Sequence, residues 1–388
     1  MRQPFINARL QGFGTTIFAE MSALAVATGS VNLGQGFPDT DGPEAVKRAA
    51  IDAITEGRGN QYPPGIGVAE LRHAVVAHQR RFYGLEVDPD REVLVVAGAT
   101  EGIAAALLSL VELGDEVIAF EPFYDSYAAC ISMAGGVRKP VTLRAPDYAL
   151  DLDALRRAIT PKTRLLLLNT PHNPTGKVFT RAELTAIAEL VVEHDILVMA
   201  DEVYEHLVFD GEHIPIASLP GMGERTITIS SAGKTFNSTG WKTGWVTGPA
   251  DLVTAVRTAK QFLTYVGTGP FQYAAAVGLA LGDDYYQGYR DDLLTKRDRL
   301  CAGLAEAGFD VLVPQGTFFI TADITPFGQR DGIAFCRSLP ERCGVVAIPC
   351  QVFYDDVDAG RSLVRFAFCK RLEVLDEAVS RLKGLRSS

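Results

Sequence analysis

Residues 165–204 read LLLLNTPHNPTGKVFTRAELTAIAELVVEHDILVMADEVY. Two short apolar runs, Leu165–Leu168 and Ile196–Ala200, flank a segment whose apolar residues have helical spacing, Arg181–His194. Thr180 stands just before that segment, where a threonine hydroxyl can cap the first backbone N–H groups of a helix. Apolar runs of this length joined through an amphipathic helix are typical of parallel strands buried on both faces. The stretch therefore predicts a β-α-β unit.

The same alternation extends from about residue 90 to residue 250. The further apolar runs are Val93–Ala97, Val117–Phe120 and Thr226–Ile229. After about residue 285 the pattern changes to a charged helix at Asp291–Ala307, two strand-like runs and a closing helix. The strand-like runs are Thr317–Ala322 and Leu363–Phe368. We predict an α/β fold with a mostly parallel central sheet, flanking helices and a smaller α+β domain.

The length of the chain and the change of pattern together predict a division into domains. Residues 1–40, which are rich in glycine and short of strand pattern, are expected to form an N-terminal arm that belongs to the small domain. Residues 41–284 are expected to form the large domain, and residues 285–388 the small C-terminal domain.

Composition excludes several classes of protein. The 388 residues carry 37 Lys and Arg against 47 Asp and Glu, a formal net charge of −10. An acidic chain repels phosphate backbones, so a nucleic acid is not expected as a partner. Apolar runs such as 103–111 reach about half of the ~20 residues that a membrane span needs, so no membrane partner is expected. The opening MRQPFINARLQGFGTT lacks the apolar core of a secretory signal, and we expect a soluble, cytoplasmic protein.

Six cysteines are spread over the chain without a CxxC pair. Cys336, Cys343 and Cys350 follow one another at intervals of seven, but zinc sites generally use closely spaced cysteine pairs with histidines nearby. We therefore expect no metal site and no disulfide framework. The cysteines are interpreted as small buried side chains in a reducing compartment.

Chemically active side chains follow the predicted strands at the points where the strands end. The segments after the five runs are Gly98-Ala99-Thr100-Glu101-Gly102, Glu121-Pro122-Phe123-Tyr124, Asn169–Gly176, Asp201-Glu202-Val203-Tyr204 and Ser231-Ala232-Gly233-Lys234. In open parallel sheets, ligands bind in the crevice outside the carboxyl ends of the strands. One crevice is therefore expected to hold a glycine-rich turn, an aromatic ring, an amide, a carboxylate, a phenol and a lysine.

Taken singly, these segments have ordinary structural explanations. An aspartate after a strand commonly caps a helix, and HNPTG (172–176) is a proline-containing turn. The segment SAGKT (231–235) resembles the end of a nucleotide-binding phosphate loop, but that motif needs glycine at position 228, which is threonine. No GxGxxG follows a strand either. The order of the segments and their shared place at strand ends favour one common site.

The ordered motifs resemble those of the fold-type I, class I and II aminotransferases, which use pyridoxal 5′-phosphate (PLP). The motifs are NLGQGFPD (32–39), NQYPPGIG (60–67), GATEGI (98–103), EPFYDSY (121–127), NTPHNPTG (169–176), ADEVYEHLVF (200–209), SSAGKTFNSTGWKTGW (230–245) and LVRFAFCK (363–370). They cover nearly the whole chain. They are most similar to the kynurenine, glutamine and methionine transaminase branch, and within it to the N-succinyldiaminopimelate aminotransferases. The resemblance implies a PLP-binding large domain, amino-group exchange between an amino acid and a 2-oxo acid, and a homodimer with active sites at the subunit interface.

The resemblance implies roles for residues around the cofactor. Lys234 matches the lysine that binds PLP covalently and then moves a proton at the substrate Cα. Asp201 is expected to face the pyridine nitrogen and to keep it protonated. Asn173 and Tyr204 are expected to donate hydrogen bonds to the phenolic oxygen of the cofactor, and Phe123 is expected to stack on its ring.

The phosphate of the cofactor is assigned in the same way. Ala99 and Thr100 open a helix, and the first N–H groups of a helix bind phosphate well. Ser231 and Lys242 match the family's other phosphate contacts on the same subunit. Tyr62 matches the tyrosine that reaches the phosphate from the neighbouring subunit.

The substrate contacts implied by the resemblance lie at both ends of the chain. Arg365 matches the arginine that binds the substrate α-carboxylate through both nitrogens of its fork. Gly36 is expected to contribute a backbone contact near that carboxylate, together with Asn173. His172 and His206 are interpreted as structural, because Lys234 already supplies the base.

Two departures from the kynurenine branch bear on the substrate. Phe18 stands where that branch tends to place a tryptophan, and Gly267-Thr268-Gly269 stands where it tends to place an aromatic–histidine pair. Smaller side chains widen the expected pocket and weaken the case for a flat aromatic substrate. We predict N-succinyl-LL-2,6-diaminopimelate with 2-oxoglutarate or glutamate, the couple of lysine biosynthesis, and expect a cation from the arm or the small domain to bind the distal carboxylate.

Three alternatives stay open at this point. The first is a broad kynurenine-, glutamine- or methionine-type transaminase. The second is another PLP reaction on the same fold, such as β-elimination from cysteine conjugates or carbon–carbon bond synthesis. The third is a DNA-binding regulator built on this fold. The acidic charge disfavours the regulator, and so do the roughly 30 residues before the GQGFP segment, which are too few for a DNA-binding domain.

Overall fold

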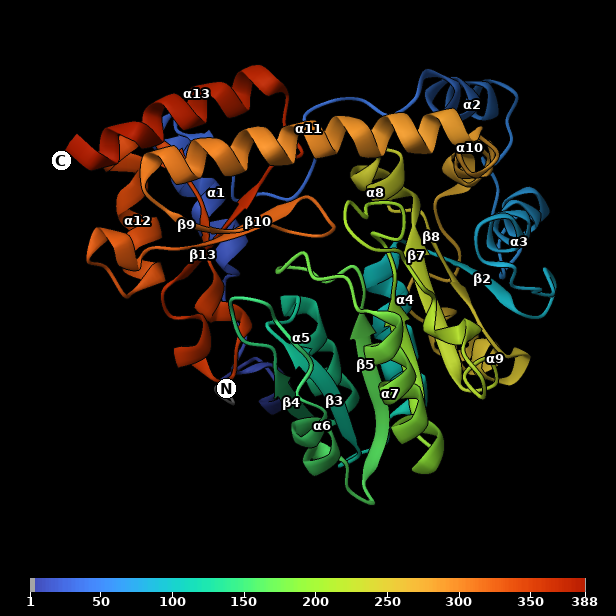
Figure 1. Cartoon of the computed structure of the whole chain (residues 1–388). Coiled ribbons are helices and arrows are strands. Elements are labelled where there is room, and N and C mark those ends of the chain that lie inside the picture. The colour runs from blue at the N-terminus through green and yellow to red at the C-terminus, as the bar shows by residue number, and fades with distance from the viewer. Residues whose placement is uncertain (1–3, 388) are drawn as a thin grey trace.

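The computed structural model of the chain describes residues 4–387, and its central feature is a seven-stranded sheet in the order β2-β8-β7-β6-β5-β3-β4 (Figure 1). The strands are β2 (Val93–Val96), β3 (Glu116–Glu121), β4 (Val137–Thr142), β5 (Thr163–Asn169), β6 (Leu197–Asp201), β7 (Thr226–Ser231) and β8 (Gly244–Thr247). Strand β8 runs antiparallel to β2 and β7, and the other neighbouring pairs are parallel. The predicted mostly parallel sheet is confirmed.

Two strands of this sheet were not predicted from the sequence. Strand β4 reads VRKPVT and lies at the edge of the sheet, where its residues are only partly buried and a proline is tolerated. Strand β8 is only four residues long and begins with Gly244. Neither has the continuous apolar run by which a buried parallel strand is recognised.

Helices cover both faces of the sheet because alternate residues of its central strands point in opposite directions. Leu165 and Leu167 of β5 join one apolar cluster, and Leu166 and Leu168 join another. The helices on the first face are α4 (Ala99–Leu110), α5 (Asp125–Ala134) and α9 (Ala250–Lys260), and those on the second face are α6 (Leu152–Ala158) and α7 (Arg181–Glu193). Each fully buried leucine stabilises this packing by roughly 1.5–3 kcal/mol.

The helix predicted after Thr180 is present. Helix α7 begins at Arg181, and the Thr180 hydroxyl accepts a hydrogen bond from the backbone N–H of Glu183. The Glu183 carboxylate accepts one in return from the Thr180 backbone N–H, which completes a capping box.

Further helices pack at the β2 end of the sheet and around it. They are α2 (Glu44–Thr55), α3 (Ala69–Tyr83), the single turn α8 (Ala232–Thr235) and α10 (Gly269–Leu279). Residues of α3 and α10 share an apolar cluster with β2 and β8, in which Trp245 is buried.

Residues 283–387, together with residues 17–33 near the N-terminus, form a second, smaller assembly of strands and helices. Its strands are β9 (Asp310–Leu312), β10 (Phe319–Asp323), β12 (Ile348–Pro349) and β13 (Leu363–Ala367), in the order β12-β13-β10-β9, and a two-residue strand β1 (Val31–Asn32) pairs in parallel with β11 (Val345–Val346). Its helices are α1 (Ile17–Thr28), α11 (Asp283–Ala307), α12 (Gly332–Cys343) and α13 (Leu372–Leu382). The boundaries proposed after residues 40 and 284 stay predictions.

Helix α11 is two turns longer than the sequence pattern predicted. It begins at Asp283, directly after Gly282, and runs without a break over both parts of the molecule (Figure 1). Asp283 and Asp284 lie in its first turn, where negative charge is stabilised by the helix dipole.

Within residues 4–387, no helix combines the length and the apolar character that a membrane crossing requires. The six cysteines are free thiols, and all except Cys343 are buried.

Candidate active site

A cavity of about 340 Å³ opens at the carboxyl ends of the central strands, where the sequence predicted a crevice. Most of the predicted site residues line it. They are Gly36, Ala99, Thr100, Asn173, Asp201, Tyr204, Ser231, Lys234, Lys242 and Arg365. Phe123 and Tyr62 lie outside the lining of this cavity. The carboxyl ends of the strands thus bring together residues from segments between Gly98 and Lys234, and Gly36 and Arg365 join them from near the two ends of the chain.

Lys234 lies on α8, the single helical turn that follows β7. Its Nζ donates to the Gly36 carbonyl oxygen at 3.4 Å and sits 5.6 Å and 5.3 Å from the ring centroids of Tyr204 and Phe318. Burial among these groups lowers the pKa of Lys234 to about 8. An appreciable fraction of the amine is therefore uncharged near neutral pH, as a nucleophile or a base requires.

Asp201 ends β6 and is buried beneath the cavity. The Tyr127 hydroxyl donates to its Oδ2 at 2.5 Å, and the backbone N–H of Val203 donates to its Oδ1 at 3.3 Å. Burial raises the pKa of Asp201 to about 6, and the Tyr127 hydrogen bond opposes that rise. The carboxylate is therefore mostly ionised at neutral pH and can pair with a protonated ring nitrogen.

The first turn of α4 forms one wall of the cavity. Gly98 precedes it with a φ of +77°, a conformation that favours glycine. A Cβ atom built on Gly98 would meet Lys242 Cε and Nζ at 3.3 Å, and one on Gly244 would meet the Ala99 nitrogen at 3.1 Å. The two glycines thus let the Lys242 ammonium approach the N-terminus of α4, a helix of 12 residues. Ser231 lines the same cavity. This set of donors suits a phosphate group.

Arg365, from β13 of the smaller assembly, is buried and lines the cavity. Its Nη1 donates to Asn173 Oδ1 at 2.9 Å and its Nη2 donates to the Gly34 carbonyl oxygen at 3.2 Å. Its guanidinium carbon lies 3.9 Å from the centroid of the Phe319 ring. Among residues 4–387, its Nε has no hydrogen-bond partner, although the atom is buried.

The charge of Arg365 is available to a ligand. No carboxylate within residues 4–387 forms an ion pair with it at 4.0 Å or less. Burial lowers the pKa of Arg365 to about 10, so the group still carries its proton at neutral pH. A buried guanidinium whose neighbours are neutral oxygens is suited to bind an anionic group such as a carboxylate.

Gly36 lies where no other residue fits. A Cβ atom at this position would come within 2.4 Å of the Phe319 ring, which itself stacks on Arg365. The glycine therefore lets the backbone of the arm approach both Lys234 and the arginine.

The prediction that Phe123 faces the site is corrected by the structure. Phe123 is buried with its ring under the Arg138 guanidinium, 4.9 Å from the centroid, and its neighbour Tyr124 lines the cavity instead. The chain leaves β3 and enters α5 at this point, so the strand alternation that would place one ring or the other in the site no longer holds. Of the adjacent pair Phe123 and Tyr124, only Tyr124 lines the cavity.

Tyr62 is highly exposed, with 80% of its surface accessible in the single chain. Its ring packs edge-on against Tyr265 with centroids 5.3 Å apart. The backbones of Gly59 and Gly269 are in close contact, since a Cβ atom on Gly269 would lie 2.4 Å from the Gly59 carbonyl oxygen. The segment 267–269 therefore lies beside the segment that carries Tyr62. The assignment of Tyr62 to a partner's phosphate stays a prediction.

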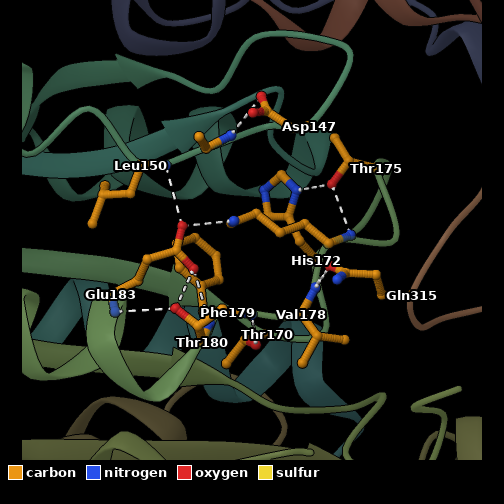
Figure 2. A network of polar contacts seen from close by, with 12 residues as sticks. Asp147, Leu150, Thr170, His172, Thr175, Val178, Phe179, Thr180, Glu183 and Gln315 are labelled. Atoms are coloured by element: carbon orange, nitrogen blue, oxygen red, sulfur yellow. Dashed lines mark hydrogen bonds and ion pairs between the residues drawn. The ribbon is translucent and has the colours of Figure 1, made fainter. Parts of the chain in front are cut away.

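The loop that carries Asn173 is held by a polar network (Figure 2). His172 Nδ1 lies 2.8 Å from the Thr175 hydroxyl, which also accepts from the Lys177 backbone N–H. The Lys177 ammonium in turn donates to Glu183 at 2.7 Å. Burial lowers the pKa of His172 to about 3, so the ring is neutral and acts within the loop rather than in the cavity.

His206 belongs to another buried network behind the site. Its Nε2 lies 2.7 Å from His78 Nε2, and nearby Glu205 accepts hydrogen bonds from the hydroxyls of Tyr83 and Ser230. His78, Glu205 and His206 bring their ligand atoms within 4.8 Å of one another, a spacing compatible with a metal ion. The hydrogen bonds that they make already account for this arrangement.

Two contacts of the site were missed by sequence reasoning. The first is the Tyr127 hydrogen bond to Asp201, and the second is Asn169, whose amide donates to the Asp201 carbonyl oxygen at 2.8 Å. Both belong to motifs that the sequence did single out. Tyr127 lies one helical turn after Tyr124, and Asn169 pairs in register with Asp201 across β5 and β6.

Fold and site together define a class of enzyme. A strand-end cavity holds a buried lysine of low pKa, a buried carboxylate, a phosphate-binding helix N-terminus and an arginine free to bind a carboxylate, which are the groups that amino-acid chemistry on PLP requires. The chain matches the family described as aminotransferase class I and II over residues 28–382, and it belongs to that family. It is therefore a transaminase.

Individual relatives are similar over their whole lengths. The chain is 55% identical, over 97% of its length and 98% of the relative's, to a Mycobacterium tuberculosis protein named "Probable N-succinyldiaminopimelate aminotransferase DapC". It is 39% identical to a methionine aminotransferase of Escherichia coli, with 98% of each chain covered. The solved structure of N-succinyldiaminopimelate aminotransferase from Mycobacterium tuberculosis superposes with a TM-score of 0.96, covering 98% of this chain and 100% of that one.

Enzymes of this family depend on PLP, and the cavity fits that cofactor. The cradle formed at Gly98 and Gly244 leaves room for a phosphate beside Lys242 where side chains would fill the space. The buried Asp201 carboxylate suits the cofactor's ring nitrogen, and the amine of Lys234 suits its aldehyde carbon. Cations and anions of the site thus match the charges of the cofactor at each end.

Proposed function

We propose that this transaminase exchanges an amino group between N-succinyl-LL-2,6-diaminopimelate and 2-oxoglutarate, in lysine and diaminopimelate biosynthesis. The observation that carries the proposal is the 55% identity over nearly the whole chain to the Mycobacterium tuberculosis protein, against 39% for the methionine aminotransferase. The geometry of the site supports it, because Arg365 offers a buried cation to the α-carboxylate that both substrates carry.

We assign the roles at the cofactor from the geometry of the cavity. When bound, PLP supplies an electron sink for the negative charge that develops at the substrate Cα. Lys234 holds the cofactor covalently and moves the proton at that carbon, since its low pKa leaves the amine partly uncharged. Asp201 keeps the ring nitrogen protonated, and Tyr127 holds Asp201 in its ionised form.

The remaining roles concern binding. Ala99, Thr100, Ser231 and Lys242 bind the phosphate, and Tyr124 covers the ring face. Tyr204 and Asn173 donate to the phenolic oxygen of the cofactor. Burial holds the pKa of Tyr204 well above its ordinary value, so its hydroxyl stays a donor throughout the working pH range.

We further propose a cytoplasmic homodimer with shared active sites. Several large apolar side chains are exposed near Tyr62 on the single chain. They are Phe262 (82% exposed), Leu263 (47%) and Tyr265 (53%). Apolar surface of this kind is typical of an interface between subunits. The free thiols of all six cysteines agree with a reducing compartment.

A second candidate is a transaminase of broad specificity for methionine-like substrates. The observation that favours it is the apolar wall of the cavity, where the rings of Phe18 and Phe319 lie 5.2 Å and 3.9 Å from the guanidinium carbon of Arg365. Such a wall suits a thioether or an aromatic side chain as well as the methylene chain of diaminopimelate.

The two candidates are distinguished by comparing kcat/KM for the succinylated substrate with the values for methionine, kynurenine and glutamine. We expect the succinylated substrate to be preferred by at least about tenfold, or about 1.4 kcal/mol in transition-state binding. A smaller preference would reject the proposal in favour of the broad-specificity enzyme.

A further inference from the structure

Lys234 extends from a helix that is too short to satisfy its own backbone. Helix α8 spans only Ala232–Thr235, and the last carbonyl groups of any helix lack partners within it. The Ala232 carbonyl oxygen accepts from the Phe236 N–H at 2.9 Å. The carbonyl oxygens of Lys234 and Thr235 lie at the end of this short helix, so their hydrogen-bond donors must come from elsewhere in the fold.

Two tyrosine hydroxyls of the long helix α11 supply these donors. The Tyr285 hydroxyl donates to the Thr235 carbonyl oxygen at 2.6 Å, and the Tyr289 hydroxyl lies 3.1 Å from the Lys234 carbonyl oxygen. The Tyr289 hydroxyl also lies 2.7 Å from Asn237 Oδ1, so its one proton is shared between two acceptors. The two residues are one helical turn apart, which brings both hydroxyls to the same turn of the chain.

The two rings are held firmly in place. They stack on each other with centroids 6.1 Å apart and planes 8° from parallel, and Phe236 packs against Tyr285 at 5.8 Å. Burial holds the pKa of Tyr289 well above its ordinary value, so its hydroxyl stays protonated and able to donate. The contacts are therefore geometric features of the fold rather than chance encounters of mobile side chains.

Helix α11 connects this pair to the small assembly. Tyr286 packs with the large-sheet residues of β2 and β8, whereas Leu293, Leu300 and Leu304 further along the helix lie in the core of the small assembly. Figure 1 shows α11 passing over α8 on its way between the two parts. The hydrogen bonds from Tyr285 and Tyr289 of α11 to α8 thus hold the backbone of Lys234 in place relative to the assembly that carries Arg365.

We propose that Tyr285 and Tyr289 are positioning residues for the transamination reaction, which hold the Lys234 turn by capping its carbonyl groups. The inference rests on the proposed role of Lys234 and extends it. Loss of either hydroxyl leaves a backbone carbonyl without its donor, and the turn that aims the amine becomes less well fixed. The consequence is slower attachment of the cofactor and slower proton transfer, while binding of the substrate carboxylate at Arg365 is unchanged.

The test compares Tyr289→Phe and Tyr285→Phe with Tyr286→Phe as a matched control. Tyr286 lies on the same helix, but within residues 4–387 its hydroxyl donates only to the carbonyl oxygens of Gly278 and Leu279, at 3.4 Å and 3.3 Å. The primary readout is the rate at which the cofactor-free protein attaches PLP, followed by visible absorbance. The others are kcat, KM and the midpoint of thermal unfolding.

We expect Tyr289→Phe and Tyr285→Phe each to slow PLP attachment and to lower kcat by about five- to tenfold, the loss of one buried hydrogen bond, with KM changed by less than about twofold. The double variant should lower kcat by a factor smaller than the product of the two single factors, because both hydroxyls act on one turn. Tyr286→Phe should keep the wild-type attachment rate.

Attachment rates and kcat values like those of Tyr286→Phe would overturn the inference, even if the variants were less stable. If Tyr289→Phe does not fold, Tyr285→Phe carries the same test. Lys234→Ala separates this result from a failure of the proposed function. If Lys234→Ala still attached PLP covalently at the wild-type rate, the role of Lys234 itself would be wrong.

Discussion

Replacing Tyr127 with phenylalanine removes one hydroxyl from the site and leaves the ring in place. That hydroxyl donates to the Asp201 carboxylate at 2.5 Å in a buried setting, and it is the largest influence that lowers the pKa of Asp201 against the effect of burial. A hydrogen bond to a charged group is worth about 1.5–3 kcal/mol, and one pH unit corresponds to about 1.4 kcal/mol. The variant should therefore raise the pKa of Asp201 from about 6 by roughly one to two further units.

The direction of the effect on cofactor binding follows from the charge of Asp201. Only the carboxylate pairs with a protonated ring nitrogen, so the affinity for PLP falls as pH drops through the pKa of Asp201. In the wild-type protein we expect this fall near pH 6, and in Tyr127→Phe near pH 7 to 8, about one to two units higher. At pH 7 the variant should bind PLP about two- to tenfold more weakly, whereas at pH 9 the two proteins should bind it about equally.

The assay is the dissociation constant of PLP for the cofactor-free protein, measured from pH 5 to pH 9. Tyr148→Phe is the matched control, because Tyr148 is equally buried but its hydroxyl meets the neutral Thr321 hydroxyl at 3.1 Å outside the cavity. The control should lose some stability and keep the wild-type pH dependence. An acid limb at the same pH in Tyr127→Phe and the wild type would refute the reasoning that Tyr127 keeps Asp201 ionised.

Three further predictions concern Asp201, Arg365 and the proposed sharing of the site between subunits. Asp201→Asn should lower kcat by about 10³-fold or more in assays with saturating substrate. The pKa of Asp201 in the folded protein, about 6, lies above the ordinary 3.8, so the ionised carboxylate destabilises the fold above pH 6 and ceases to do so as pH falls toward 4. The free energy of unfolding of cofactor-free Asp201→Asn should therefore exceed that of the wild type by up to about 3 kcal/mol at pH 7 and should equal it near pH 4. An unchanged free energy of unfolding at pH 7 would contradict this prediction. Arg365→Lys should raise KM for both the amino acid and the 2-oxo acid by about 10- to 100-fold, because a lysine cannot form the two-nitrogen contact, and an effect on only one of the substrates would argue against a shared carboxylate site. Mixing and refolding Tyr62→Ala with Lys234→Ala should restore about a quarter of wild-type activity, because half of the dimers then carry one complete site, whereas no recovery would count against a shared site.

Much of the fold could be predicted from the sequence because buried parallel strands are recognisable as continuous apolar runs. The five runs identified in this way became β2, β3, β5, β6 and β7 within a residue or two. Strand β4 was not predicted because it lies at an exposed edge and contains charged residues and proline. Strand β8 was not predicted because it is very short. The start of α11 was missed since its first two turns are rich in aspartate and tyrosine rather than in regularly spaced apolar residues.

The site was predictable to the extent that it depends on topology. The rule that ligands bind at the carboxyl ends of parallel strands brought Asp201, Lys234 and the Gly98 turn into one cavity. The choice between Phe123 and Tyr124 depended on how the chain turns from β3 into α5, which no periodicity in the sequence encodes. Contacts such as Tyr127 with Asp201 depend on side chains from different elements, and only the assembled fold reveals them.

The proposed function requires that Lys234 carries the cofactor in this cavity. Lys242 lines the same cavity and provides a stringent alternative, since its amine also lies beside the proposed phosphate site. The most direct test is to reduce the PLP-loaded protein with borohydride, digest it and locate the pyridoxyl group by mass spectrometry. We expect a single modified peptide with the label on Lys234, and loss of that label in Lys234→Ala. A label on Lys242, or a Lys234→Ala protein that is still labelled and active, would contradict it.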